Sequence, residues 1–141
     1  MMQGLFLEDL SVGQSAELVR TVLEADIEAF AAVTGDNNPV HLDAAFAATT
    51  SFGERIAHGM LSAGYISAVI GTQLPGPGAI YLSQALRFKR AVRIGDTVTA
   101  RATITEIDEA KARVTLATVC LVNGKPVLDG EALIMVPRKA A

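Results

Sequence analysis

The chain has 141 residues, the length of one ordinary domain, and half of them are hydrophobic. Together with 19% charged residues, this composition excludes an intrinsically disordered chain. Twelve basic and fifteen acidic residues give a net charge of −3, which argues against a nucleic-acid-binding protein. We therefore expect a single globular domain over residues 1–141.

Cysteine content and the first ten residues indicate the compartment. Cys120 is the only cysteine, so the chain can form neither an internal disulfide nor a cysteine-based zinc site. The first ten residues contain Glu8 and Asp9 and no basic residue, which does not fit a secretory signal. These features predict a protein of the reducing cytoplasm.

The N-terminal half is expected to hold one strand followed by helices. We expect a strand at 14–22, a helix at 25–34, a short helical or irregular segment at 40–50 and a second helix at 57–72. Gly35 is the expected C-terminal stop of the first helix. The sequence GDNNP at 35–39 predicts a turn, because Asp and Asn bond their own backbone and Pro fixes φ.

An uncharged stretch covers residues 56–86, which include no Asp, Glu, Lys or Arg. Glycines and the sequence PGPG at 75–78 interrupt it, so its apolar part is shorter than the ~20 residues that a membrane span needs. We therefore expect no contact with a membrane. The helix at 57–72 is apolar on nearly every side, which predicts burial in a core.

The C-terminal half has a period of two, which is typical of strands. Small apolar residues alternate with Thr and Arg over 97–105. Further strands are expected at 80–89, 113–122 and 127–136. The last is expected to bulge or bend near Gly130, and Asn123-Gly124 predicts a two-residue hairpin. The sequence therefore predicts an α+β domain in which an antiparallel meander wraps the long apolar helix.

The first candidate for chemistry is Asp36, which precedes His41 across a turn stiffened by Pro39. Histidine titrates near neutrality and a carboxylate can orient it or take a proton itself, so the pair could perform general acid–base catalysis. Water held by both groups would become a nucleophile without a metal. Alternatively, Asp36 caps a turn and His41 is a surface residue. The two histidines and scattered carboxylates show no recognisable metal-ligand spacing.

The second candidate is Gly59, which follows His58 at the start of the apolar helix. Backbone N–H groups at a helix N-terminus are unpaired, and glycine lets a ligand approach them closely. A carbonyl oxygen that gains negative charge could be stabilised there. Alternatively, Gly59 permits tight packing and His58 is a cap or packing residue.

A third feature is a basic cluster in the segment 87–93. Its four cations are Arg87, Lys89, Arg90 and Arg93. Basic side chains so close together could bind phosphate groups. They could equally form the solvated face of a strand.

These features lie in segments that resemble a known family. The sequence FAAVTGDNNPVH at 30–41, followed by Ala47, is similar to the signature of the (R)-specific enoyl-CoA hydratases of the MaoC-like group. Further similar segments are HGML at 58–61, LRFKRAV at 86–92, GDTV at 95–98 and GEA at 130–132. The resemblance covers nearly the whole chain.

The resemblance implies a hot-dog fold, in which an antiparallel sheet wraps a long central helix. It implies a homodimer with the active site near the subunit interface. The implied activity is that of a hydro-lyase, which adds water reversibly to trans-2-enoyl-CoA and gives (R)-3-hydroxyacyl-CoA without a metal or redox cofactor. We expect acyl chains of roughly four to six carbons by analogy. Acyl carrier preference and pathway stay open, whether polyester monomer supply, fatty-acid degradation or biosynthesis.

Position by position, the resemblance assigns Asp36 and His41 to a catalytic pair that activates water for C3 and supplies the proton for C2. It leaves open which side chain makes which transfer. Asn38 would hold the loop in shape, and the Gly59 N–H would polarise the thioester carbonyl. Ser67 matches a polar residue near the site in some members. Contacts with the phosphates of coenzyme A are expected from Arg87, Lys89 and Arg90.

Two other functions remain open from the sequence. A thioesterase on the same fold would direct a carboxylate and water at the thioester carbonyl and would release free thiol from a saturated acyl-CoA. A non-catalytic module would bind acyl-CoA without turnover. A non-catalytic module would not require Asp36 and His41 to face one cavity.

Overall fold

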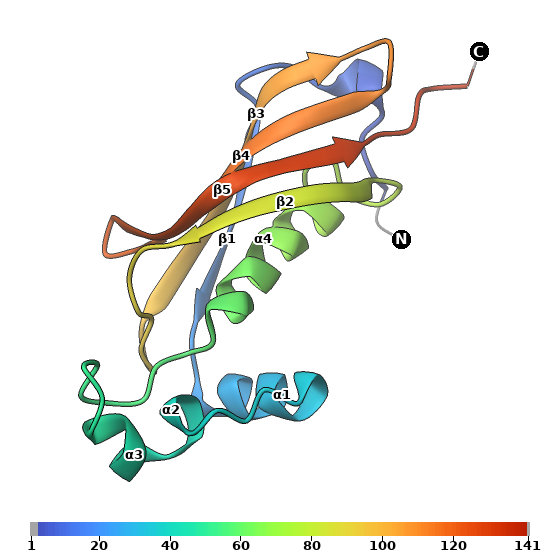
Figure 1. Ribbon diagram of the computed structural model, residues 1–141. Helices are drawn as coiled ribbons and strands as arrows, with labels where there is room; N and C mark the ends of the chain where they lie inside the picture. The colour runs from blue at the N-terminus through green and yellow to red at the C-terminus, as the bar shows by residue number, and fades with distance from the viewer. Residues whose placement is uncertain (1–2, 141) are drawn as a thin grey trace.

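The computed structural model describes residues 3–140, which form one antiparallel sheet and a long helix with three shorter ones (Figure 1). Met1, Met2 and Ala141, at the ends of the predicted domain, lie outside the described residues. In chain order the elements are η1 (Leu7–Asp9), β1 (Ser15–Thr21), α1 (Glu24–Thr34), α2 (Pro39–Leu42), α3 (Ala44–Ala48), α4 (Gly59–Thr72), β2 (Ile80–Phe88), β3 (Thr97–Asp108), β4 (Arg113–Val122) and β5 (Lys125–Met135). The predicted α+β class is confirmed.

The sheet has the strand order β1-β3-β4-β5-β2, with every neighbouring pair antiparallel. Strands β3, β4 and β5 form the predicted meander. The prediction is wrong for β2, which pairs with β5 and not with β3, the next strand in sequence. Period-two patterning identifies strands but does not say which of them pair. As a result, β2 lies at an edge of the sheet.

The β4–β5 connection is the predicted two-residue hairpin. Asn123 and Gly124 have φ values of 51° and 75°, and the flanking Val122 and Lys125 are register partners. Positive φ at both central residues is what a type I′ turn requires, and its twist matches that of the strands. The turn therefore fixes the register between β4 and β5.

Strand β5 is irregular near Gly130, as predicted, but the break lies at Val127, since Cys120 and Leu121 of β4 pair with Leu128 and Pro126. The register passes through Gly130 without a break in both the β4–β5 and the β2–β5 pairs. A Cβ atom at this position would lie 1.8 Å from the carbonyl oxygen of Ala85 on β2. Glycine is needed here because the two backbones approach closely, and not because the strand is interrupted.

Helix α4 packs one face against the sheet, and the three shorter helices gather beyond its N-terminal end (Figure 1). Its buried face carries Tyr65, Ile66, Val69 and Ile70. On the sheet side, large residues such as Ile104 alternate with small ones. The buried sheet residues include Val98, Ala100, Ala102, Ile104, Leu116, Ala132 and Ile134. Alternating sizes let the helix and the sheet interdigitate.

The opposite face of α4 is not buried, although the sequence predicts burial on nearly every side. Gly64 and Ser67 are exposed, and Met60 keeps 53% of its surface accessible. In the described part of the chain, no element covers this face. None of the helices formed by residues 3–140 combines the length and the hydropathy that crossing a bilayer would need.

The first helix, α1, ends where the sequence predicts. Gly35 adopts the left-handed conformation with φ of 81°, and its N–H donates to the carbonyl of Ala31 at 2.9 Å. The start of α1 is fixed by Asp26, whose carboxylate accepts from the Leu23 N–H at 2.9 Å. The chain therefore leaves α1 at Gly35 in a defined direction and enters the turn that carries Asp36.

Candidate active site

The turn after α1 is shaped by hydrogen bonds among its own residues. The carboxylate of Asp36 accepts from the Asn38 N–H at 3.4 Å. The Asn38 side chain accepts from the Val40 N–H at 3.0 Å, which makes Asn38 the N-cap of α2. The short helix α2 then presents His41 from its last turn. Asp36 and Asn38 themselves are exposed.

His41 is held in a defined orientation. It is 9% exposed, and its Nδ1 lies 2.8 Å from the carbonyl oxygen of Ile56. A carbonyl oxygen only accepts, so Nδ1 carries the hydrogen, and in the neutral ring Nε2 keeps its lone pair. The backbone of the same residue is also fixed, because Arg55 Nε donates to the His41 carbonyl at 2.7 Å and Nη1 of Arg55 pairs with Glu24 at 2.7 Å.

The second histidine, His58, lies directly against this pair. Its ring stacks on His41 with centroids 3.9 Å apart and an interplanar angle of 29°. Its Nε2 lies 2.9 Å from the carbonyl oxygen of Asp36, and the side chain is 2% exposed. One nitrogen or oxygen of each of Asp36, His41 and His58 lies within 4.8 Å of the others. The fold therefore brings the predicted pair together.

The same three side chains are close enough to contact a metal ion. Hydrogen bonds to backbone carbonyls already engage one nitrogen of each ring, Nδ1 of His41 and Nε2 of His58. A metal would have to bind the remaining nitrogens, which belong to two stacked rings. Metal-ligating histidines commonly donate their other ring N–H to a backbone carbonyl, so the free nitrogens are Nε2 of His41 and Nδ1 of His58. The same groups can transfer protons, because Asp36 is a carboxylate and Nε2 of His41 keeps its lone pair.

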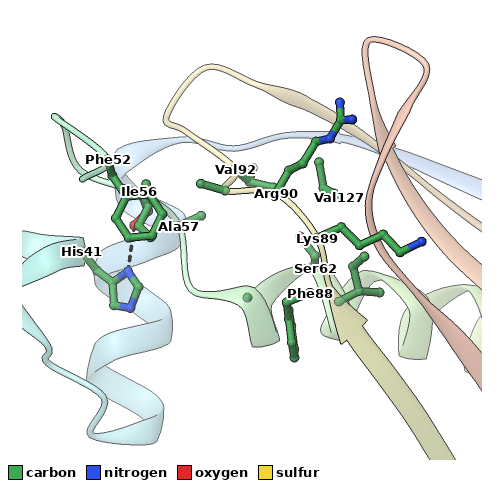
Figure 2. A pocket seen from close by; sticks show the side chains of 13 residues that line it. His41, Phe52, Ile56, Ala57, Ser62, Phe88, Lys89, Arg90, Val92 and Val127 are labelled. Atoms are coloured by element: carbon green, nitrogen blue, oxygen red, sulfur yellow. Dashed lines mark hydrogen bonds between the residues drawn. The ribbon is translucent and has the colours of Figure 1, made fainter. Parts of the chain in front are cut away.

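Beside His41 a cavity of about 330 Å³ opens between the helices and the sheet (Figure 2). Its helical wall consists of His41, Phe52, Ile56, Ala57, Gly59 and Ser62. Its strand wall consists of Phe88, Lys89, Arg90, Ala91, Val92, Val127 and Leu128. A mostly apolar cavity with a few convergent polar groups is typical of a small-molecule site.

Gly59 and Phe88 meet where the two walls join. Gly59 is the first residue of α4, so its N–H has no partner within the helix. A Cβ atom there would lie 2.6 Å from Cε1 of the Phe88 ring. Glycine at this position therefore lets the Phe88 ring lie against the start of α4, beside a backbone donor at the cavity that also contains His41.

The predicted basic residues divide between the cavity and a separate hollow on the sheet. Lys89 and Arg90 belong to the strand wall, but in Figure 2 both side chains point away from His41. Lys89 forms an ion pair with Asp129, with Nζ and Oδ2 2.7 Å apart. Arg87 lines a separate hollow together with Arg101 and other β-strand residues. Arg90 forms no ion pair within residues 3–140.

Ser67 and Ser62 show a further difference between prediction and geometry. Ser67 is exposed on α4 and is not among the residues that line the cavity. Ser62, which the sequence does not single out, is 2% exposed and lines it. The sequence could have indicated Ser62, because residues three and four apart on a helix share a face, and Ser62 is three after Gly59.

Burial raises the pKa of the neighbouring Cys120 thiol to about 12, so that thiol is inert.

The chain is similar to known proteins over most of its length. The family model described as "MaoC like domain" matches residues 10–124. An (R)-specific enoyl-CoA hydratase of Rhodospirillum rubrum is 56% identical over 134 residues, covering 95% of this chain and 93% of the relative. A 3-hydroxybutyryl-CoA dehydratase of Methylorubrum extorquens is 51% identical, with 96% and 86% covered. The unliganded structure of R-hydratase PhaJ1 from Pseudomonas aeruginosa superposes with a TM-score of 0.92 at 53% identity, covering 98% and 89%.

Proposed function

The chain belongs to the MaoC-like domain family, and we propose that it is an (R)-specific enoyl-CoA hydratase with the hot-dog fold of the R-hydratases. The observation that carries this proposal is the convergence of Asp36, His41 and His58 beside a cavity that also exposes the first backbone position of α4. The reaction adds water to trans-2-enoyl-CoA and gives (R)-3-hydroxyacyl-CoA. It is reversible.

In the proposed mechanism, Asp36 and His41 hold one water molecule between them. The Nε2 lone pair of His41 or the Asp36 carboxylate removes a proton as the water oxygen bonds to C3. The electrons of the double bond shift toward the thioester carbonyl, whose oxygen gains negative charge. The Gly59 N–H at the positive end of α4 stabilises that oxygen. Protonation at C2 then completes the addition.

We propose that no metal or redox cofactor takes part and that coenzyme A enters only as part of the substrate. Addition of water leaves the overall oxidation state unchanged, so the reaction needs no electron carrier. Asp36 and His41 supply the proton acceptor and the proton donor, and the backbone N–H of Gly59 supplies the oxyanion donor. Asn38 contributes by capping α2 and so holding the Asp36 turn in shape.

For substrate binding we propose that Arg90 contacts the phosphates of coenzyme A, with Lys89 nearby. Both belong to the strand wall, and Arg90 has no ion pair within the described residues. Arg87 lies at the other hollow and Ser67 on an exposed face, so they would contribute only in an assembly that brings them to the site. The cavity of about 330 Å³ suits a short acyl chain of roughly four to six carbons.

We propose that the protein is a homodimer assembled through β2 and α4. Strand β2 is an edge strand, and Ile80, Tyr81 and Leu82 are 39–55% exposed along it. Pairing β2 with its copy would extend the sheet and cover this edge and the exposed face of α4 with Gly64 and Ser67. Sedimentation should then give twice the chain mass, and a monomer would contradict the proposal. The buried, unpaired Cys120 fits our further proposal of a cytoplasmic location.

The test of the activity is the absorbance of the enoyl-thioester band of crotonyl-CoA after addition of purified protein. A fall with many turnovers supports the hydratase. The product should be oxidised by an (R)-specific 3-hydroxyacyl-CoA dehydrogenase and not by an (S)-specific one. Release of thiol from butyryl-CoA would indicate a thioesterase instead. Saturable binding of crotonyl-CoA without a change in absorbance would indicate a non-catalytic module.

A further inference from the structure

We propose that His58 is a positioning residue that holds Asp36 and His41 in register for the reaction. The proposal rests on the proposed hydratase function. His58 itself faces neither solvent nor the cavity: it is 2% exposed and does not line the cavity wall. It therefore acts through the two side chains that it contacts.

The contact with Asp36 is through the backbone. Apart from the helical bond that ends α1, the hydrogen bonds of residues 35–38 are local, and they connect residues two or three apart. The bond from His58 Nε2 to the Asp36 carbonyl, at 2.9 Å, is the one that joins this turn to a distant segment of the described chain. Because Asp36 is exposed and little packed, this bond decides where its carboxylate lies relative to α4.

The contact with His41 is through the ring. Stacking at 3.9 Å fixes the plane of the His41 imidazole, while its Nδ1 bond to Ile56 fixes the rotation within that plane. On the other side, the Phe30 ring lies 4.6 Å from His58 and limits its movement. His58 also precedes Gly59 in the chain, at the N-cap position of α4. One buried side chain thus connects the acid, the base and the oxyanion donor.

The hydrogen bonds assign opposite tautomers to the two histidines. A carbonyl only accepts, so His58 carries hydrogen on Nε2, whereas His41 carries it on Nδ1. Nδ1 of His58 is buried and has no partner within residues 3–140. The neutral ring with hydrogen on Nε2 satisfies this geometry, because a proton on Nδ1 would have no acceptor.

Two amide variants separate the effect of the hydrogen bond that His58 donates from the effect of its ring. In His58→Gln the side-chain nitrogen is as many bonds from Cα as Nε2 of histidine is. In His58→Asn it corresponds to Nδ1 instead. We expect His58→Asn to lower kcat for crotonyl-CoA about tenfold with KM within about twofold, as for the loss of one positioning hydrogen bond. We expect His58→Gln to restore kcat to within about threefold of the wild type.

A third variant tests the stacking contact separately. His58→Phe keeps a ring against His41 and removes the donor, so its kcat should fall below the wild-type value but less than that of His58→Asn, which loses both contacts. Thermal unfolding midpoints are measured for all variants, so that each kcat is known to come from folded protein. Wild-type kcat in His58→Asn would overturn the proposal. An equal loss in His58→Gln and His58→Asn would also overturn it, because packing and not the donated bond would then be what matters.

The tautomers supply a readout that does not depend on activity. Long-range ¹H–¹⁵N correlation spectra of histidine-labelled protein contain only two rings. Hydrogen on Nε2 of His58, together with amide shifts at Asp36 and Asn37 in His58→Asn but not in His58→Gln, supports the proposal. Hydrogen on Nδ1 of His58 overturns it. If the wild type turns over no enoyl-CoA, the hydratase function fails, and the spectra still decide whether His58 holds the turn.

Discussion

The helical wall and the strand wall of the cavity differ in how their polar groups are held. On the helical wall, His41 is 9% exposed and is fixed by backbone hydrogen bonds and by a stacked ring. On the strand wall, the side chain of Lys89 is 46% exposed, and it pairs with a carboxylate at the surface. Surface ion pairs contribute little to stability and do not fix geometry.

This difference indicates a division of labour between chemistry and binding. Proton transfer needs groups held within hydrogen-bond distance of the reacting atoms, which the helical wall provides. Binding a flexible charged substrate requires only that a cation can reach it, which suits Lys89 and Arg90. Changes in the helical wall should therefore reduce kcat, and changes in the strand wall should raise KM.

The largest effect is expected when the acid–base pair is removed. Asp36→Ala and His41→Ala should each lower kcat for crotonyl-CoA at least ~10²-fold, within the range of general acid–base catalysis. Because both side chains act on one water molecule, the double variant should be little worse than either single one. Steady-state hydration rates measure this.

The matched control for the pair is Glu109→Ala, which removes an exposed carboxylate from the turn between β3 and β4. Its kcat should equal that of the wild type. Losses that multiply in the Asp36→Ala and His41→Ala double variant would show that the two residues act independently, and the shared water would then have to be abandoned.

A smaller loss of activity is expected when Gly59, where the helical and strand walls meet, is replaced. Gly59→Ala keeps the backbone donor, but the new methyl group would lie 2.6 Å from the Phe88 ring. The ring must move at the cavity, so we expect kcat/KM to fall about tenfold through displaced groups and not through lost chemistry. Adding Phe88→Ala to Gly59→Ala should recover part of the loss, because the obstacle is gone.

Gly71→Ala is the control for this substitution. Gly71 lies in the same helix, and a Cβ atom there has nothing within 4 Å. Because Gly71 shares the α4 face with Gly64 and Ser67 that the proposed dimer would cover, sedimentation of the variant is measured alongside, and with the dimer intact its kcat/KM should stay at the wild-type value. If Gly59→Ala is as active as the wild type, the contact with Phe88 does not shape the cavity, and the two walls are less closely coupled than the geometry indicates.

Substitutions in the strand wall should raise KM and leave kcat unchanged. Arg90→Ala should raise KM for crotonyl-CoA about fivefold and leave kcat near wild type, because the phosphate contact is the same in the ground and transition states. Added salt should narrow the gap between variant and wild type. Lys89→Ala should have the smaller effect, since Asp129 already neutralises Lys89. An unchanged KM in Arg90→Ala would place the phosphates elsewhere.

The sequence predicts the helical wall better than it predicts the strand wall. Asp36, His41 and Gly59 lie in short local motifs, and the turn and helix start that position them depend on nearby residues. For that reason the local positions of these three residues could be predicted, although Asp36 lies next to His41 and not on the cavity wall itself. The sequence motifs do not single out Ser62 as a cavity residue, although its helical spacing from Gly59 places it on the same face.

The strand wall depends on contacts that no local pattern reports. Pairing of β2 with β5 brings residues 40 to 55 positions apart side by side, such as Leu86 and Gly130. This pairing explains why Gly130 meets Ala85 and why no bulge forms there. The basic residues also separate, because Arg87 lies within β2 and lines the other hollow, whereas Lys89 and Arg90 follow the end of β2 and line the cavity beside His41.

The smallest effect is expected on removal of metal ions. Dialysis against EDTA should leave kcat within experimental error, because the proposed proton transfers use the Asp36 carboxylate and the His41 imidazole directly. Bound metal in the dialysed protein is measured by mass spectrometry, so that incomplete removal is recognised. A large loss of activity that Zn²⁺ or Mn²⁺ restores would show that Asp36 and the two histidines hold a metal, and the helical wall would then act through a metal-bound water.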